Sequence, residues 1–511
     1  MTTAITNTAT IIGIDAHVIE VEADVSIGLG AFNIVGLPDG AIKESRDRIM
    51  AALNNACGGF PIRKVVVNLA PADIRKSGTG FDLPIAMAIL EASKVVPEKS
   101  LRENLIIGEL SLEGLIRPID GMLAVALAAK KAGISTLIVP EENGAAASLV
   151  DGLTIMTANS IKEVVSHFHG EQPLPEYIAD LAETLHPQAT THFDFSDVRG
   201  QETAKRALEI AAAGKHNVLF TGPPGSGKSM LSKRMPGILP PLSFEEALEV
   251  SKIHSIAGTL SKDHQIMGER PFRSPHHSIS GAGMVGGGSY PKPGEISLAH
   301  NGVLFLDELP EFPRNIIDLL RQPIEEKRVI IARANATLTF PADFLLLAAM
   351  NPCPCGYLGD ANKECHCSAA GIIKYRSKIS GPMMDRIDLQ VEMPNLSYDE
   401  MNFSNKGESS RQIRARVVLA RIMQTERFRS NPNRYNSGMD HQEVEEYCEL
   451  KTDGHRLLSS ITDKFRLSGR AHDSVLKVAR TIADLEQSDS IETRHLAEAV
   501  NYRCLDRELN F

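Results

Sequence analysis

The stretch "NVLFTGPPGSGKSM", residues 217–230, decides the fold of this chain. Its centre follows the pattern G-x-x-x-x-G-K-S, which runs from Gly222 to Ser229. Residues 217–220 are typical of a short buried strand, and the residues from Ser229 to Pro236 are typical of a helix. A strand, a glycine-rich loop and a helix in this order form a cradle for the phosphates of a nucleoside triphosphate.

The residue types in this loop fit the chemistry of phosphate binding. Glycines let backbone N–H groups turn toward the phosphates, and the start of the helix adds partial positive charge. We expect Lys228 to neutralise the β- and γ-phosphates and Ser229 to hold Mg²⁺. The sequence therefore predicts an ATP site with Mg²⁺, whose binding residues are Gly222, Pro223, Pro224, Gly225, Ser226, Gly227, Lys228, Ser229 and Asp307.

Two further apolar stretches end in polar side chains. "GVLFLDEL", residues 302–309, is typical of a buried strand that ends in two carboxylates. Asp307 is suited to orient Mg²⁺, and Glu308 is suited to polarise the water that attacks the γ-phosphate. "FLLLAAMNPC", residues 344–353, predicts another buried strand, and the amide of Asn351 at its end can hydrogen-bond the γ-phosphate or the water.

Length and local composition indicate about three domains. Residues 1–170 mix strand-like and helical stretches, as in a compact α/β domain. Residues 171–192 contain three prolines and few large apolar side chains, so we expect a linker. Residues 193–395 alternate strands with helices, which predicts a mostly parallel sheet, and residues 396–511 are mainly helical.

The overall composition is that of an ordinary soluble protein, with 43% hydrophobic and 23% charged residues. No apolar run approaches the roughly 20 residues that span a bilayer, and the N-terminus lacks the basic region of a signal peptide. We therefore expect a cytoplasmic protein without a membrane partner. The net charge of −10 argues against indiscriminate coating of nucleic acid but is compatible with a local basic channel.

Four of the seven cysteines lie in one short stretch, "CPCGYLGDANKECHC", residues 353–367. Two C-x-C pairs can close four thiolates around Zn²⁺ at about 2.3 Å, and four thiolates leave no open position for catalysis. The spacing is tighter than in common zinc modules, so free structural cysteines are the alternative. The predicted structural zinc ligands are Cys353, Cys355, Cys365 and Cys367.

Several motifs together resemble the magnesium-chelatase-like branch of the AAA+ ATPases and, within it, the family of the competence protein ComM (YifB). They are "GPPGSGKS", "GEISLAHNGVLFLDEL", "AAMNPCPCG" and "SGPMMDRIDL", and the resemblance covers essentially the whole chain. It implies a ring of identical subunits, usually six, with ATP bound between neighbours.

The resemblance also assigns roles to single residues. Lys228 would be the Walker A lysine, Asp307 and Glu308 the Walker B pair, and Asn351 sensor 1. The catalytic set that it implies adds an arginine finger that acts on a neighbouring subunit and a sensor-2 arginine, and so comprises Glu308, Asn351, Arg386 and Arg470. Considered without the resemblance, each of these two arginines is typical of a surface ion pair.

A long segment separates the P-loop from the acidic strand. Residues 270–300, "RPFRSPHHSISGAGMVGGGSYPKPGEISLAH", resemble the helix-2 insert that projects toward the pore in this branch. Residues 325–344 resemble a hairpin before sensor 1. Each charged residue here alone is typical of a solvated loop, but their joint placement suggests DNA contact by Arg273, His276, His277, Lys292 and Arg333.

A second basic stretch, residues 411–434, carries seven arginines. They can meet DNA phosphates or belong to a solvated or packed helix face.

The N-terminal residues resemble the fold of the Lon protease. Residues 75–82, "RKSGTGFD", correspond to the stretch with the Lon nucleophile, and residues 120–125, "DGMLAV", to the stretch with its lysine. In that alignment Gly80 replaces the serine and Leu123 replaces the lysine, and neither can perform nucleophilic catalysis. We expect an inactive domain that helps to assemble the ring or guides DNA. Ser77 or Thr79 acting with Lys76 is the alternative.

The expected function is that of a ring-forming ATPase that moves on DNA. The resemblance implies a helicase that promotes branch migration on single-stranded or branched DNA, during homologous recombination in natural transformation. The alternatives are an ATPase subunit of magnesium chelatase, an unfoldase of a protease-like complex and a scaffold that only binds ATP. The Lon-like domain disfavours the first, Gly80 and Leu123 disfavour the second, and Glu308 disfavours the third.

Overall fold

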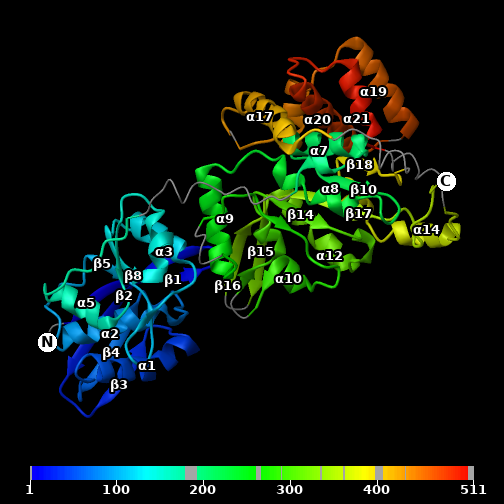
Figure 1. The fold of residues 1–511 in the computed structure, drawn as a ribbon. Helices are drawn as coiled ribbons and strands as arrows, with labels where there is room; N and C mark the ends of the chain where they lie inside the picture. Colours follow the sequence, from blue (N-terminus) through cyan, green and yellow to red (C-terminus); the bar gives the residue numbers. More distant parts are fainter. Residues whose placement is uncertain are drawn as a thin grey trace. The chain divides into compact units, whose positions relative to one another are not determined.

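The computed structural model describes residues 3–178, 193–260, 266–288, 291–333, 336–360, 363–396, 407–431, 433–465 and 467–503. The chain divides into two compact units, shown in Figure 1: Met1–Pro187 with Ala247–Met267, and Gln188–Glu246 with Gly268–Phe511. From residue 179 onward the expected linker at 171–192 lies outside the described residues. The domain limits given above therefore stay predictions, and each unit is described by itself.

The first unit is built on a seven-stranded sheet with the order β3-β4-β2-β1-β5-β8-β9. Strands β1–β2 and β2–β4 pair antiparallel, and the other neighbours pair parallel. Burial alternates along β4, because successive side chains of a strand point to opposite faces. The strands are β1 (Ala4–Ile12), β2 (Asp15–Ser26), β3 (Ala31–Val35), β4 (Lys64–Ala70), β5 (Asn104–Ile106), β8 (Thr136–Pro140) and β9 (Thr154–Ala158).

Helices pack on this sheet and close its core. Residues 82–91 of α2 are all buried, whereas α1 buries one side and is capped by Asp39, whose carboxylate accepts the N–H of Ile42. A short hairpin, β6 (Glu109–Leu110) and β7 (Ile116–Arg117), completes the unit. The helices are α1 (Gly40–Ala56), η1 (Thr79–Phe81), α2 (Asp82–Ala92), α3 (Met122–Lys131), η2 (Glu141–Asn143), α4 (Gly144–Ser148) and α5 (Ile161–Phe168).

Helix α9 (Phe244–Ala257) is distant from this unit in sequence, but most of it packs there. The hydroxyl of Ser255 accepts the backbone N–H of Gly121 at 3.1 Å, and Lys252 pairs with Asp15 at 2.6 Å. Local sequence pattern gives no sign of this association.

The second unit contains a five-stranded parallel sheet with the order β11-β14-β17-β10-β18. The parallel sheet predicted from the sequence is thereby confirmed. Every residue of β10, β14 and β17 is buried, as expected for a parallel sheet covered on both faces. The strands are β11 (Phe272–Arg273), β14 (Val303–Leu306), β17 (Leu345–Met350), β10 (Val218–Thr221) and β18 (Leu389–Glu392).

Shorter elements surround this sheet. The predicted hairpin before sensor 1 is confirmed by the antiparallel pairing of β15 (Arg328–Arg333) with β16 (Ala336–Pro341). The insert holds a smaller pair, β12 (Gly286–Gly287) and β13 (Lys292–Pro293). The helices are η3 (Phe195–Asp197), α7 (Glu202–Gly214), α8 (Lys228–Ser232), η4 (Met235–Gly237), α10 (Gly281–Val285), α11 (Glu295–Leu298), η5 (Leu309–Glu311), α12 (Arg314–Leu319), α13 (Arg321–Glu326), α14 (Ala369–Arg376) and α15 (Gly381–Met384).

The C-terminal part is helical, as the sequence predicts. Its central helix α20 is buried along most of its length and packs against α7 and α17. The side chain of Thr481 on α20 contacts His216, which precedes β10, at 2.8 Å. The helices are α17 (Ser410–Arg427), η6 (Asn436–Gly438), α18 (His441–Tyr447), α19 (Thr452–Phe465), α20 (Gly469–Leu485) and α21 (Thr493–Asn501).

The basic stretch at 411–434 is used mainly inside the protein. Arg416 pairs with Glu209 and Glu408, Arg427 pairs with Asp484, and the guanidinium of Arg421 lies 3.4 Å from the ring centroid of Tyr435. Arg414 donates to the carbonyl of Gly237, and Arg434 pairs with Glu443. These contacts favour the packed helix face over DNA binding.

Among the described residues, none of the helices combines the length and the apolar character that crossing a membrane requires.

Candidate nucleotide-binding site

The P-loop connects β10 to α8 and needs glycine at several positions. Gly225 and Gly227 have φ angles of +85° and +91°, which L-residues with side chains rarely adopt. A Cβ atom at Gly222 would lie 2.2 Å from the carbonyl oxygen of Met393. The backbone of the loop is therefore specified by its glycines, and it presents its N–H groups at the start of α8.

Lys228 is a buried cation held by this loop. Its Nζ atom donates to the carbonyl oxygens of Gly222 at 2.6 Å and Pro223 at 2.8 Å, and it lies 3.4 Å from Oδ1 of Asn351. Burial lowers the pKa of Lys228, although the carboxylates of Asp307 and Glu308 act in the opposite direction. The position suits a cation whose acceptors are replaced by phosphate oxygens when ATP binds.

The ends of β10, β14 and β17 meet at one edge of the sheet, because Thr221 pairs with Met350 and Leu306 pairs with Ala348. The hydroxyl of Ser229, at the start of α8, consequently donates to Oδ2 of Asp307 at 2.5 Å. Hydroxyl and carboxylate oxygens are hard ligands, so this pair fits Mg²⁺. The structure thus brings together Lys228, Ser229, Asp307 and Asn351, which the sequence predicts as one site.

Glu308 adopts a left-handed conformation with φ at +53°, which is uncommon for a residue with a side chain and is frequent at functional sites. Its backbone N–H donates to Oδ1 of Asp307 at 3.0 Å, and its carboxylate is more than half exposed. Oε2 of Glu308 lies 3.6 Å from Nδ1 of His277. The carboxylate is therefore accessible to water and has a neighbour that the sequence does not predict.

A cleft of about 600 Å³ extends along the P-loop from Pro224 to Gly227. Its lining combines apolar side chains with polar ones, a mixture suited to a base and a sugar. The described residues that complete it are Asp197, Val198, Arg199, Gln201, Met230, Tyr357, Asp360, Lys363, Met393, Asn395 and Leu396.

The two arginines predicted to act in catalysis contact the same carboxylate. Oε1 of Glu325 lies 2.5 Å from Nη2 of Arg386 and 3.2 Å from Nη2 of Arg470. The described residues that line the cleft include neither arginine. Glu325 thus lies between Arg386 and Arg470 and pairs with both.

The predicted DNA-contacting residues have different surroundings. Arg273 forms a two-pronged pair with Glu295, with both N–O distances at 2.7 Å, and this hydrogen bonding raises the pKa of Arg273. The rings of His276 and His277 lie 4.0 Å apart between centroids. Lys292 is exposed on β13. Arg333 ends β15, and its side chain lies outside the described residues.

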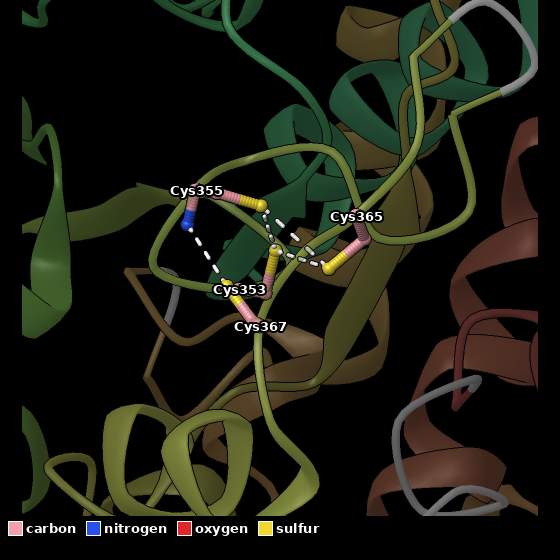
Figure 2. Close-up of side chains that lie close together, drawn as sticks. All are labelled: Cys353, Cys355, Cys365 and Cys367. Carbon is pink, nitrogen blue, oxygen red and sulfur yellow. Dashed lines mark hydrogen bonds between the residues drawn. The ribbon is translucent and has the colours of Figure 1, made fainter.

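The four cysteines of the 353–367 loop gather in one cluster, drawn in Figure 2. The sulfur of Cys353 lies 3.3 Å from that of Cys355 and 3.6 Å from that of Cys365, and the sulfur of Cys367 accepts the backbone N–H of Cys355 at 3.4 Å. All four sulfurs lie within 4.8 Å of one another. Four thiolates at these separations fit a tetrahedral metal ion.

The positions aligned with the Lon catalytic pair are packed in the first unit. A Cβ atom at Gly80 would lie 3.2 Å from Cγ1 of Ile107, and Leu123 is buried in the first turn of α3. Lys76 is buried too, and its Nζ atom donates to the carbonyl of Pro71. These surroundings are apolar or already hydrogen-bonded, and the absence of protease activity stays a prediction.

Three contacts of the site were not predicted from the sequence. They are His277 against Glu308, Glu325 between the two arginines, and the cysteine loop as a wall of the cleft. Each joins segments that are distant along the chain, and no local motif indicates them.

The parallel sheet, the P-loop and the polar strand ends define a P-loop nucleoside triphosphatase of the AAA+ type. Three protein-family models match this chain. The model described as "Magnesium chelatase, subunit ChlI" matches residues 194–401, and the model of its C-terminal part matches residues 407–503. The model described as "Subunit ChlI of Mg-chelatase" matches residues 21–143.

Curated relatives extend these matches to the full length. The uncharacterized protein YifB of Salmonella typhimurium is 44% identical, and the competence protein ComM of Haemophilus influenzae is 43% identical. Both alignments cover 100% of this chain, with 98% of the first relative and 99% of the second. Lon protease 2 of Bacillus subtilis is 28% identical over 34% of each chain. The chain belongs to the ComM/YifB family of magnesium-chelatase-like AAA+ proteins.

Proposed function

We propose that this protein is a ring-forming, ATP-dependent DNA motor that acts as a helicase and promotes branch migration in homologous recombination during natural transformation. The observation that carries the motor part is the convergence of Lys228, Ser229, Asp307 and Asn351 around the P-loop, beside an exposed Glu308. The DNA part is supported by the 43% identity to a protein named for competence.

In the proposed reaction the P-loop N–H groups and Lys228 bind the phosphates of ATP. Ser229 and Asp307 hold Mg²⁺, which when bound offsets negative charge on the phosphates. Glu308 accepts a hydrogen bond from the attacking water and orients it in line with the γ-phosphate. Asn351, next to Lys228, fixes the position of the γ-phosphate or the water. ATP hydrolysis thus uses side chains from three adjacent strand ends.

Arg386 is the arginine finger and supplies positive charge to the nucleotide of a neighbouring subunit, and Arg470 is the sensor-2 arginine. Both arginines contact Glu325 in the second unit; the side chain of Arg470 is exposed, whereas that of Arg386 is largely covered. In a ring Arg386 faces the nucleotide of the next subunit and exchanges Glu325 for the γ-phosphate. Hydrolysis at each site then depends on assembly, and a hexamer is the ring that the family resemblance implies.

The insert and the β15–β16 hairpin contact DNA at the pore. Lys292 is exposed and offers a cation, whereas Arg273 is held by Glu295 and orders the base of the insert. The cysteine cluster holds a structural Zn²⁺, since its four sulfurs match the ligand set of such sites.

The test is the rate of ATP hydrolysis by the full chain with four additions: single-stranded DNA, a branched junction, an unfolded protein and a magnesium chelatase partner complex. We expect stimulation by the two DNA substrates alone. Stimulation by unfolded protein alone would support an unfoldase, and stimulation by the chelatase partners alone would support a chelatase subunit. Either result would reject the DNA motor.

Glu308→Gln tests the assignment of the water-polarising residue. The amide keeps the shape of the side chain but is a poor base, so hydrolysis should fall by about 10²-fold or more while nucleotide binding is retained. Glu311→Gln on the neighbouring turn is the matched control and should hydrolyse at the normal rate. Full hydrolysis by Glu308→Gln would remove the role given to this carboxylate.

A further inference from the structure

The loop that carries the four cysteines also forms one wall of the nucleotide cleft. Between Cys355 and Cys365 the chain presents Tyr357, Asp360 and Lys363 to the cleft. Candidate metal ligands and cleft-lining residues therefore lie on the same short segment of the second unit. A change in how firmly this segment is held would therefore affect both the cysteine cluster and the nucleotide cleft.

The loop lies directly against the P-loop. Gly356 has a φ angle of +87°, and a Cβ atom there would lie 2.7 Å from Cδ of Pro224. The side chain of Asn395 donates to Asp360 at 2.6 Å, and Nζ of Lys363 lies 4.7 Å from the ring centroid of Tyr357. These contacts hold the segment beside the P-loop and join two residues that line the cleft.

The cysteine loop has few interactions of its own that would hold it in one conformation. Between the end of β17 at Met350 and the start of α14 at Ala369, the described residues contain no helix or strand. Its described side chains are mostly polar or partly exposed, so burial of apolar surface contributes little to their ordering. A metal ion that binds four side chains of the loop supplies the free energy that orders it.

The sulfur positions fit such a metal. Zn²⁺ with four thiolates at about 2.3 Å places neighbouring sulfurs about 3.8 Å apart in a tetrahedron. Three of the sulfur separations here are 3.3, 3.6 and 3.6 Å, and all lie within 4.8 Å. Small shifts of the side chains suffice to close the site around one ion.

We propose that Zn²⁺ bound by Cys353, Cys355, Cys365 and Cys367 fixes the wall of the nucleotide cleft, so that metal binding and nucleotide binding strengthen each other. The inference rests on the proposed ATP site and adds a regulatory input to it. Coupling of two ligands is reciprocal: the factor by which Zn²⁺ raises nucleotide affinity equals the factor by which the nucleotide raises Zn²⁺ affinity.

The test measures both sides of this coupling on the full chain. Binding of a fluorescent ATP analogue is titrated with the Zn²⁺-loaded and the chelator-stripped protein, and Zn²⁺ affinity is titrated with and without the same analogue. We expect both factors to be about five- to tenfold and equal within error. If both ligands bind tightly but neither changes the affinity for the other, the proposed coupling is wrong.

A variant separates the wall from the metal. Tyr357→Ala removes a cleft-lining side chain without touching a ligand, so it should retain about one Zn²⁺ per chain and lose most of the coupling. Cys365→Ser should lose Zn²⁺ and bind nucleotide as the stripped protein does. Cys57→Ser, in the first unit, is the matched thiol control and should behave as the unaltered chain. Unchanged coupling in Tyr357→Ala would contradict the assigned wall.

The measurements also distinguish this inference from the proposed function. A chain that hydrolyses ATP and holds no Zn²⁺ would overturn the inference alone. A chain that holds Zn²⁺ and binds no nucleotide would overturn the proposed function as well, because the cleft would then have another ligand.

Discussion

The two sheets of this chain differ in what their functional positions contain. In the second unit, the residues after β10, β14 and β17 include a buried lysine, a serine, two carboxylates and an amide that contact one another. In the first unit, the positions aligned with the catalytic pair of the Lon protease hold Gly80 against Ile107 and the buried Leu123.

The two units differ in the kind of side chain that is buried at these positions. Burial lowers the pKa of Lys228, because the charged amine loses hydration there, and the phosphates of the proposed nucleotide would offset that loss. Leu123 instead contributes to the stability of its unit by ordinary apolar packing. A residue kept for chemistry should therefore affect turnover when replaced, whereas one kept for packing should affect unfolding.

The largest effect is expected for Lys228→Ala. Loss of the cation that contacts the P-loop carbonyls removes the principal charge for the phosphates, so hydrolysis should fall by about 10³-fold or more. Binding of a fluorescent ATP analogue and release of phosphate measure the loss. Lys233→Ala, with an exposed side chain after the same helix, should be nearly normal. Equal losses of ATP hydrolysis in Lys228→Ala and Lys233→Ala would contradict the role given to Lys228.

An intermediate effect is expected for Arg386→Ala. An arginine that acts on the neighbour's nucleotide contributes about 10³-fold to hydrolysis in related chemistry, so turnover should fall while nucleotide binding is retained. Mixing this variant with Lys228→Ala provides the sharper measurement. At some interfaces the first variant supplies the P-loop and the second supplies the arginine, so mixed rings should regain part of the activity. No recovery in mixed rings would show that Arg386 acts within its own subunit.

The smallest effect on turnover is expected for Leu123→Ala. The deletion leaves a cavity in the first unit and should lower its free energy of unfolding by about 2–5 kcal/mol, as measured by denaturant unfolding. Peptide hydrolysis should be absent in both the variant and the unaltered chain. Peptidase activity in the unaltered chain that is lost on Lys76→Ala would show that the first unit keeps a catalytic site.

The sequence predicts those features that a short segment determines. The P-loop pattern and the two apolar strands that precede Asp307 and Asn351 are features of this kind, and their polar side chains lie in contact. The four cysteines of one short stretch also lie in one cluster. Their proximity follows from parallel strands, whose carboxyl ends share one edge of a sheet.

Contacts between distant segments were not predictable in this way. Nothing in the local pattern indicates that His277 approaches Glu308 or that Arg386 and Arg470 share Glu325. The charge of Arg273 was expected to meet DNA, but it is paired with Glu295, because a nearby carboxylate satisfies a guanidinium whether or not DNA is present. Such pairings depend on the packed structure and leave no periodic signal.

The measurement that tests the account most directly follows the position of the branch in a fluorescently labelled DNA junction. With ATP and Mg²⁺ the unaltered chain should move the branch until the arms separate, while ADP in place of ATP, or the Glu308→Gln variant, should leave it in place. Rapid ATP hydrolysis at the same rate with and without the junction, with the branch unmoved, would contradict the central claim.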